Sequence, residues 1–429
     1  MNSAASMKTR SRHAVGWMAG QLESVRAYYL REARMAESDL IQGKCAPEFD
    51  RVREVFSESF ERGDEIGASV CITIEGETVV DLWGGHLDKE KTQPWQRDTL
   101  ANVYSTTKGI TSLAAHRLIE EGRLELDAPV AKYWPEFAAG GKSELPVRYL
   151  LSHQAGLAAV AKPLHAGAIE EWDTMTAALA EQAPWWVPGE KHGYHALTFG
   201  WLVGELIRRI SGRSVGTYVR EEIAEPLGVE FYIGCPEELD PRISDLHAGP
   251  IIAPENGPSF DMVSEILSNP DGMFAKAFAN PAPTGPLEVM ASRRAWRAAE
   301  IPAANGHTNA HSLARIYTAL SLGGTLDGVT LLSPESIERA RTEQVCGEDE
   351  ILPMRISRFG LGFYMPAEDE PVGPNSEVFG HAGAGGSHGQ ADPENRMGFG
   401  YVMNNLHQGV WMVDPRPRAL LAAAYKAIE

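Results

Sequence analysis

Strand-forming sequence occurs near both ends of this chain of 429 residues and is scarce in its middle. The run "GASVCITIEGETVVDLWGG" predicts a β-hairpin in which residues 68–74 pair with residues 78–83 around the turn Glu75-Gly76. Strand-like runs return only beyond residue 376, between glycine-rich turns. Apolar residues at helical spacing predict helices over 47–62, 106–122, 146–152, 168–183, 196–211, 310–322 and 413–427. The simplest packing joins the first and last strands into one antiparallel sheet, with the terminal helices on one face.

This order of elements predicts an α+β fold with two lobes. We expect residues 47–124 and 300–429 to form an α/β domain, a central antiparallel sheet flanked by helices. Residues 125–299 are rich in proline and in helical patterns, and would form a mostly helical second domain, with long loops over 250–300. Residues 1–46 are expected to be an N-terminal extension with partial helix.

The composition is typical of a folded, soluble protein with an acidic surface. Hydrophobic residues make up 43% of the chain, charged residues 23%, and the formal net charge is −19. This balance argues against nucleic-acid binding, because phosphate recognition depends on Lys and Arg. No run approaches 18 apolar residues and no signal-peptide core is recognisable, so we expect a cytoplasmic protein without membrane contact. The four cysteines form no C-x-x-C pair, which favours reduced structural thiols.

Ser105 and Lys108 stand at the start of the helix predicted over 106–122. Serine is a good helix N-cap, so an ordinary capping role is one interpretation. The other is nucleophilic catalysis, because positions i and i+3 share a helix face and the lysine amine would reach the serine hydroxyl. Lysine acts as that base only if burial or nearby positive charge lowers its pKa. The free backbone amide of Ser105 would then be a candidate oxyanion donor.

The blocks around this tetrad resemble a known superfamily. S-x-x-K opening a long helix, followed by "LELDAPVAKYWPEF" and "PVRYLLSHQAGL", resembles the serine β-lactamases and penicillin-binding proteins. Within it, the chain is most similar to the class C-like branch that contains the family VIII carboxylesterases, over roughly residues 47–425. The resemblance implies a β-lactamase/transpeptidase-like fold and a serine hydrolase that works through an acyl-enzyme.

Two further blocks of that family have counterparts here. The tyrosine motif, usually Tyr-x-Asn, corresponds to Tyr194-His195-Ala196, and the resemblance implies that Tyr194 shares a proton network with Ser105 and Lys108. The Lys-Thr-Gly block corresponds to His381-Ala382-Gly383, which implies that His381 and Gly383 bind substrate. The amide of Ala384 would be the second oxyanion donor beside that of Ser105. Simpler interpretations are a packed tyrosine at a helix start and glycines that permit tight turns.

Both departures from the family pattern bear on specificity. The motif asparagine that helps hold a β-lactam amide is Ala196 here, and the lysine that helps bind the antibiotic carboxylate is His381. A site without these polar partners discriminates poorly in favour of β-lactams, whereas hydrolysis of a neutral ester needs neither group.

Two other patterns offer competing chemistry. Gly385-Gly386-Ser387-His388-Gly389 fits the G-x-S-x-G nucleophile elbow, which requires a strand before it and a helix after it, whereas a polar turn and a strand are predicted to follow. The histidines at 192, 195, 381 and 388 lack the spacing of a metal motif, so we expect no metal and no cofactor. Trp185 and Trp186 fit an acyl pocket or ordinary core packing equally well.

The sequence therefore predicts a serine carboxylesterase that hydrolyses short-chain acyl esters, with Ser105 as nucleophile and Lys108 and Tyr194 as general base. A β-lactamase or D-alanyl peptidase, with β-lactams as weak substrates, and an acyltransferase are the alternatives within enzymes. A non-catalytic binding or assembly relative is the alternative outside them. A small-molecule ester is the expected partner, and the sequence leaves the oligomeric state open.

Overall fold

The structure is a computed structural model that describes residues 40–252, 262–352, 356–367, 372–409 and 412–429. Residues from Gly43 to Glu429 form one compact unit. Most of the predicted extension over residues 1–46 lies outside the described residues.

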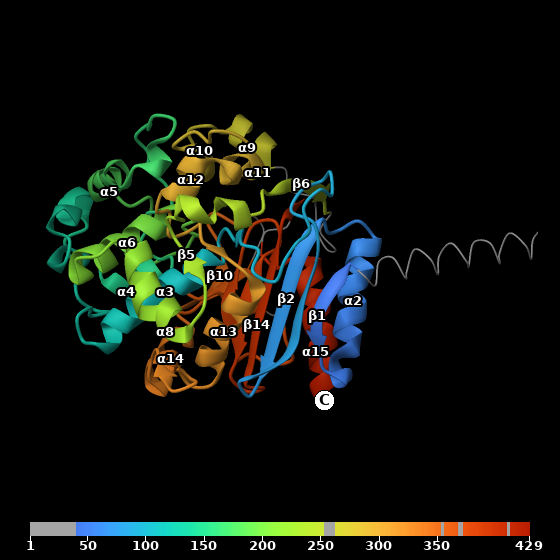
Figure 1. Ribbon diagram of the computed structural model, residues 1–429. Helices are drawn as coiled ribbons and strands as arrows, with labels where there is room; N and C mark the ends of the chain where they lie inside the picture. Colours follow the sequence, from blue (N-terminus) through green and yellow to red (C-terminus); the bar gives the residue numbers. More distant parts are fainter. Residues whose placement is uncertain (1–39, 253–261, 353–355, 368–371, 410–411) are drawn as a thin grey trace, which may run out of the picture. The chain divides into compact units, whose positions relative to one another are not determined.

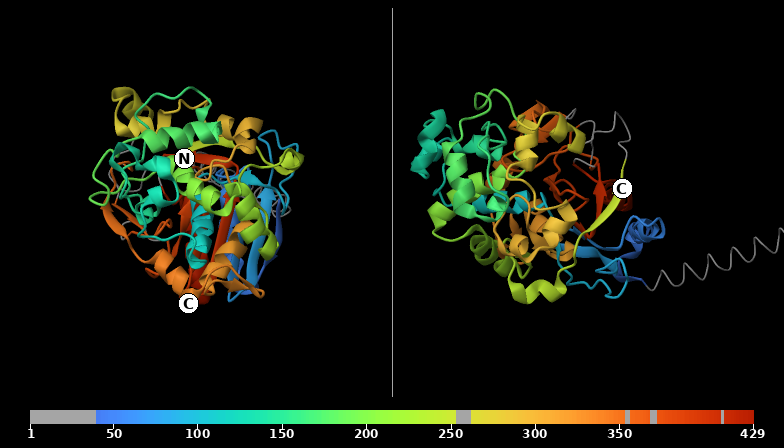
Figure 2. Two further views of the ribbon diagram at one scale, coloured as in Figure 1. Left: turned by 90° about the vertical axis from the view of Figure 1, so that its left-hand side faces the viewer. Right: turned by 90° about the horizontal axis from the view of Figure 1, so that it is seen from above.

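The unit is built on a six-stranded antiparallel sheet that joins the two ends of the chain. Its strand order is β1-β3-β2-β14-β13-β12. The strands are β1 (Ile41–Cys45), β2 (Gly67–Ile74), β3 (Glu77–Gly85), β12 (Phe379–Ala382), β13 (His388–Asp392) and β14 (Met397–Met403). The predicted hairpin forms as β2 and β3, and β2 pairs with β14 from Ala68↔Met403 to Ile74↔Met397. The blue and red strands in the left view of Figure 2 show this pairing of the first and last strands.

The backbone conformation of the hairpin turn explains why glycine occurs there. Glu75 and Gly76 both have positive φ, 51° and 92°, as the tight two-residue connection of a twisted hairpin requires. The turn fixes the register of β2 against β3, so that Val70, Ile72 and Leu82 are fully buried.

Helices cover both faces of this sheet. On one face α2 (Asp50–Glu61) packs against α15 (Pro415–Ile428), as predicted for the terminal helices, and on the other α13 (Ala310–Ser321) packs against β2 and β14 (Figure 1). Side-chain caps define two helix starts, because Asn309 accepts from the Ser312 amide and Asp414 accepts from the Arg416 amide.

The central part of the chain is mostly helical and carries the candidate site. The helices are α3 (Thr107–Glu120), α4 (Val147–Leu151), α5 (Trp172–Glu181), α6 (Thr198–Ser211), α7 (Val215–Val219), α8 (Glu225–Leu227) and α14 (Pro334–Arg341). Short helical turns are η1 (Pro47–Phe49), η2 (Val130–Lys132), η3 (Pro135–Gly141), η4 (Ala168–Glu170), η5 (Arg220–Ala224) and η6 (Glu237–Arg242). Helix α3 packs against α6 and against the edge strand β12, so its first turn lies where the helical part meets the sheet.

Small sheets and further helices complete the unit. The remaining strands are β4 (Ala101–Asn102), β5 (Phe231–Tyr232), β6 (His247–Ile251), β7 (His307–Thr308), β8 (Thr325–Leu326), β9 (Val329–Thr330), β10 (Val345–Glu348), β11 (Ile356–Phe359) and β15 (Asn405–Gln408). The prediction of long loops over 250–300 is wrong for residues 262–298, which form α9 (Met262–Ser268), α10 (Met273–Ala279), α11 (Leu287–Ser292) and α12 (Arg294–Ala298). These helices are short and are separated by Pro and Gly, which hid their periodicity in the sequence.

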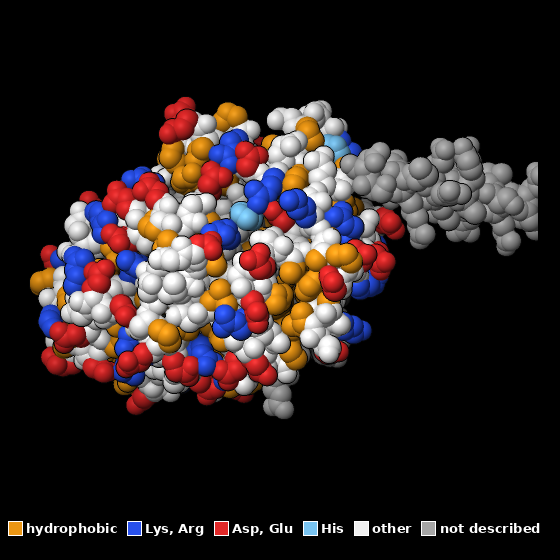
Figure 3. All heavy atoms as spheres, turned by 60° about the horizontal axis from the view of Figure 1, so that its bottom comes forward, with side chains coloured by type: hydrophobic (Ala, Val, Ile, Leu, Met, Phe, Trp, Pro, Cys, Tyr) orange, Lys and Arg blue, Asp and Glu red, His pale blue; other side chains and the backbone are white. Residues whose placement is uncertain are grey.

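Charge of both signs is dispersed over one face of the molecule. On the face shown in Figure 3, Asp and Glu side chains lie among Lys, Arg and hydrophobic side chains. No helix of the described residues is long and apolar enough to cross a membrane.

Candidate active site

Ser105 lies in a tight loop between a short strand and the start of α3. Strand β4 ends at Asn102, and the Val103 amide donates to the Gly306 carbonyl (2.8 Å). Tyr104 then has a positive φ of 41°, an uncommon conformation for a large side chain. Burial of the Tyr104 ring and a hydrogen bond from its hydroxyl to the Leu287 carbonyl (2.6 Å) hold this conformation. The loop presents Ser105, which is half-buried, at the mouth of the helix.

The capping interpretation of Ser105 is wrong. The residue before the helix is Thr106, and no side-chain hydrogen bond caps α3. Instead, the Ser105 hydroxyl oxygen lies 3.0 Å from the Lys108 amine, within hydrogen-bond distance. The i, i+3 spacing therefore brings the two side chains together as predicted.

Lys108 is completely buried and its amine has three oxygen neighbours. Besides Ser105 Oγ, these are the carbonyl oxygens of Ala196 at 2.7 Å and Ala303 at 2.9 Å. No carboxylate of the described residues forms an ion pair with it. Burial lowers the pKa of Lys108 well below its usual value of 10.5.

The arrangement suits a neutral amine. An –NH2 group donates two hydrogen bonds, which the two carbonyls accept, and its lone pair is left for the Ser105 hydroxyl proton. Ala196 thus contributes through its backbone, so its support of Lys108 does not depend on its side chain.

Tyr194 lies beside this pair. The Lys108 amine is 4.8 Å from the centroid of the Tyr194 ring, and the ring stacks on Phe359 with centroids 6.0 Å apart. Burial raises the pKa of Tyr194 above its usual value, although hydrogen bonding to Ser105 lowers it in part. The phenol is therefore neutral at physiological pH and retains a proton to donate.

Sequence reasoning missed the residues that hold Tyr194 in place. The Asp349 carboxylate accepts the Tyr194 backbone amide at 2.9 Å, together with the amides of Ile351 and Leu352. His153, with a positive φ of 60°, packs edge-on against the Tyr194 ring. His153 falls inside the quoted block "PVRYLLSHQAGL", so its histidine was the available signal; Asp349 had none.

The turn between β12 and β13 lies against the loop that carries Ser105. The Ser387 hydroxyl donates to the Val103 carbonyl at 2.7 Å and lies 2.9 Å from the Thr106 hydroxyl. A Cβ atom at Gly383 would collide with the Val103 carbonyl, so only glycine allows this approach. Within the described residues, the backbone amides of Ser105 and Ala384 donate no hydrogen bond, which leaves both available as donors.

Ser387 is therefore a structural contact and not an exposed nucleophile. Its side chain is almost completely buried, and residues after it form strand β13 where a nucleophile elbow would require a helix.

His381 lies within the site and is uncharged. Its ring centroid is 6.0 Å from that of Tyr194, and its Nδ1 lies 2.7 Å from the Ala382 carbonyl oxygen, which makes Nδ1 the protonated nitrogen. Nε2 is then an acceptor, buried and without a partner in the described part of the chain. Burial lowers the pKa of His381 to about 3.

The other predicted histidines take separate partners. His195 accepts from the Leu157 amide and lies 2.7 Å from the Gly193 carbonyl, His192 contacts Ser357, and His388 contacts Gln390. In the described ranges, the one group with ligand atoms close enough for a metal is Cys71, Asp81 and His311, where Arg97 already contacts both Asp81 and His311. The two tryptophans are partly buried, with their indole N–H groups bonded to the carbonyls of Ala159 and Lys191.

This arrangement is a serine-hydrolase type of site. A buried lysine contacts a serine at the mouth of a helix, and a neutral tyrosine and a glycine turn lie beside them. The Beta-lactamase family matches residues 52–424, and the chain belongs to this family, with its β-lactamase/transpeptidase-like fold.

Individual relatives within this family include esterases and a penicillin-binding protein homologue. The chain is 34% identical to the esterase/beta-lactamase LipL of Mycobacterium tuberculosis over 376 residues, 87% of this chain and 85% of that protein. A family VIII carboxylesterase crystal structure superposes with a TM-score of 0.81 at 40% identity, covering 90% of this chain and 99% of that one. A penicillin-binding protein homologue from Caulobacter crescentus superposes equally well, at 41% identity and with the same coverage. The predicted resemblance and fold class are confirmed.

Proposed function

We propose that this protein is a serine carboxylesterase that hydrolyses short-chain acyl esters. The contact between the Lys108 amine and the Ser105 hydroxyl, together with the burial that lowers the pKa of the lysine, carries the proposal. The esterase relatives support a serine ester hydrolase as the general class.

In the first half of the reaction, the Ser105 oxygen attacks the ester carbonyl while its proton passes to the neutral Lys108 amine. The carbonyl oxygen becomes an oxyanion, and the amides of Ser105 and Ala384 are the two donors available for it. The bond from the carbonyl carbon to the alcohol oxygen then breaks. Lys108 returns its proton to that oxygen through the Tyr194 phenol, leaving an acyl group on Ser105.

In the second half, water replaces the alcohol. Lys108 accepts a proton from the attacking water, and the carbon–oxygen bond to Ser105 breaks as the serine recovers its proton. Because the Tyr194 phenol stays neutral, it relays protons and Lys108 is the base.

Neutral esters suit this site better than carboxylate-bearing substrates. A lysine at position 381 would offer a fixed positive charge, but His381, with its pKa of about 3, is uncharged at neutral pH. A charge-assisted hydrogen bond to a substrate carboxylate contributes about 1.5–3 kcal/mol, so its absence disfavours β-lactams and D-alanyl peptides by roughly 10- to 100-fold.

The test is turnover of p-nitrophenyl acetate, butyrate and decanoate beside the β-lactam nitrocefin, with Ser105→Ala as control. We expect the acetate and butyrate to give the highest kcat/KM, and a stoichiometric burst of p-nitrophenol wherever deacylation is the slower step. A kcat/KM for nitrocefin above that for butyrate would replace the esterase assignment with a β-lactamase. Ester turnover that survives in Ser105→Ala would remove the proposed nucleophile.

A further inference from the structure

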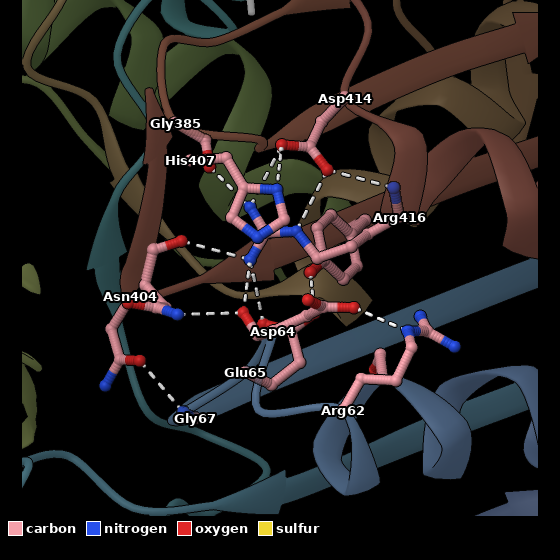
Figure 4. Close-up of polar contacts among 12 residues, drawn as sticks. Arg62, Asp64, Glu65, Gly67, Gly385, Asn404, His407, Asp414 and Arg416 are labelled. Atoms are coloured by element: carbon pink, nitrogen blue, oxygen red, sulfur yellow. Dashed lines mark hydrogen bonds and ion pairs between the residues drawn. The ribbon is translucent and has the colours of Figure 1, made fainter. Parts of the chain in front are cut away.

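A buried ionic cluster lies behind the turn that carries Ala384. Arg416 at the start of α15, Asp414 and Glu65 have side chains that are 2%, 0% and 0% exposed (Figure 4). His407 Nδ1 lies 3.0 Å from Asp414, and the Tyr401 hydroxyl donates to Glu65. Burial of charges at this depth is costly unless each is paired, so the cluster needs a reason to exist.

The guanidinium group of Arg416 uses its full fork of donors. Nε donates to Asp414 Oδ1 at 2.9 Å, and Nη2 donates to Asp414 Oδ2 at 3.1 Å. Nη1 is within hydrogen-bond distance of Glu65 Oε2 and of the carbonyls of Asp64 and Asn405. A lysine ammonium has three donors and no planar fork, so lysine is not an equivalent residue here.

The remaining donor of Arg416 reaches the turn itself. Nη2 donates to the Gly385 carbonyl at 2.6 Å, and the His407 backbone amide donates to the same oxygen at 3.1 Å. Gly386, with a φ of 129°, leaves no space for a Cβ atom, which would collide with the guanidinium group. The cluster therefore contacts the two residues that follow Ala384 directly.

The turn transmits this contact to the Ala384 amide. The Gly386 amide donates to the Gly383 carbonyl at 3.0 Å, which closes a four-residue turn with Ala384 as its second residue and Gly385, φ 86°, as its third. The Gly385 carbonyl that Arg416 holds shares one peptide plane with the Gly386 amide, and the Gly383 carbonyl shares another with the Ala384 amide. The turn hydrogen bond from the Gly386 amide to the Gly383 carbonyl joins these two planes, so the direction of the Ala384 N–H depends on the contact between Arg416 and Gly385.

We propose that Arg416 is a positioning residue for catalysis, which aims the Ala384 amide at the oxyanion by anchoring the Gly385 carbonyl. The proposal rests on the proposed function, in which Ala384 is an oxyanion donor. Asp414 and Glu65 act one step further away, by holding the guanidinium group in the orientation that reaches Gly385.

The experiment compares Arg416→Lys with Arg297→Lys. Arg297 is another buried arginine, paired with Asp245 at 2.6 Å, in α12 and away from the turn. Each variant is measured for thermal unfolding, for kcat and KM with p-nitrophenyl butyrate, and for inhibition by a trifluoromethyl ketone, which forms a tetrahedral oxyanion adduct on the serine.

Loss of one oxyanion donor lowers kcat by about 10²- to 10³-fold, and a misdirected donor retains part of that effect. For Arg416→Lys we therefore expect kcat to fall about 10- to 100-fold, KM to change less than about threefold, and the ketone to bind weaker by the same factor as kcat falls. Arg297→Lys should leave kcat and ketone affinity within about twofold of wild type.

A folded Arg416→Lys protein with wild-type kcat and ketone affinity would overturn the proposal, as would an equal loss in Arg297→Lys. If Arg416→Lys fails to fold, Asp414→Asn takes its place, because asparagine still caps α15 while weakening the hold on Arg416; unchanged ketone affinity there also overturns it. Failure of the proposed function looks different, since wild type itself would then show no Ser105-dependent turnover.

Discussion

The stability of Lys108→Met relative to wild type should depend steeply on pH. The substitution replaces a fully buried amine by an apolar side chain of similar size. Because burial lowers the pKa of Lys108 in the folded protein, the unfolded chain takes up a proton that the folded protein does not hold. Unfolding is then favoured by acid, so the wild-type free energy of unfolding rises with pH between the folded-state pKa and 10.5.

The slope is that of one proton, about 1.4 kcal/mol per pH unit. Methionine does not titrate, so the wild-type stability minus that of Lys108→Met should increase between pH 7 and pH 9, by at most about 2.7 kcal/mol. Activity should fall in the same variant by about 10²- to 10⁴-fold, the usual contribution of a general base.

Lys142→Met is the matched control. Lys142 is also buried and its amine donates to three carbonyls, but it takes no part in the proposed mechanism. The three carbonyls belong to Ala139, Ala180 and Gln182. Burial lowers the pKa of Lys142 to about 8, so its stability difference should stay flat from pH 7 to 8 and rise only above pH 8.

The assay is urea unfolding followed by tryptophan fluorescence at pH 7, 8 and 9, with linear extrapolation to water. A difference for Lys108→Met that does not change with pH would show that the lysine is charged in the folded protein. A charged lysine cannot accept the Ser105 proton, and the reasoning about the base would be refuted.

Three other predictions address single groups in the site and its support. Tyr194→Phe should lower kcat for p-nitrophenyl butyrate about 10²-fold or more while fluorophosphonate labelling of the nucleophile persists at a reduced rate, because the relay is lost but the base remains; unchanged kcat would remove the phenol from the mechanism. His381→Lys should raise the ratio of nitrocefin to butyrate kcat/KM about tenfold, which His381→Gln should not do, and equal ratios would show that charge at this position does not set specificity. Glu65→Gln should remove a pH-dependent loss of stability. Burial raises the pKa of Glu65 to about 7 in the folded protein, although Arg416 and Tyr401 oppose this shift, so the free energy of unfolding of wild type should fall by about 3 kcal/mol relative to that of the glutamine variant as pH rises from 4.5 to 7. A difference between the two proteins in urea unfolding that stays constant across that range would contradict this.

The sequence predicted those parts of the fold that local patterns determine. Two β-rich runs on either side of Glu75-Gly76 predicted the hairpin, and the helical pattern over 310–322 predicted α13. The short helices between residues 262 and 298 escaped, since one or two turns broken by Pro and Gly contain too few residues for a period.

Some residues of the site could likewise be predicted from local spacing, and others could not. Ser105 and Lys108 could be paired from spacing alone, since i and i+3 meet on any helix. The carbonyls of Ala196 and Ala303 that hold Lys108 belong to the backbone, so the identity of these residues does not predict the contacts. Asp349 and Arg416 reach the site from 155 and 31 residues away from the groups that they bind, Tyr194 and Gly385, and only the folded chain brings them there.

The identity of the nucleophile is tested most directly by intact-mass spectrometry after treatment with a fluorophosphonate. Wild type, Ser105→Ala and Ser387→Ala are labelled in parallel and assayed with p-nitrophenyl butyrate. We expect one adduct and ester turnover in wild type and in Ser387→Ala, and neither in Ser105→Ala. An adduct and ester turnover that persist in Ser105→Ala, or that vanish only in a correctly folded Ser387→Ala, would contradict it.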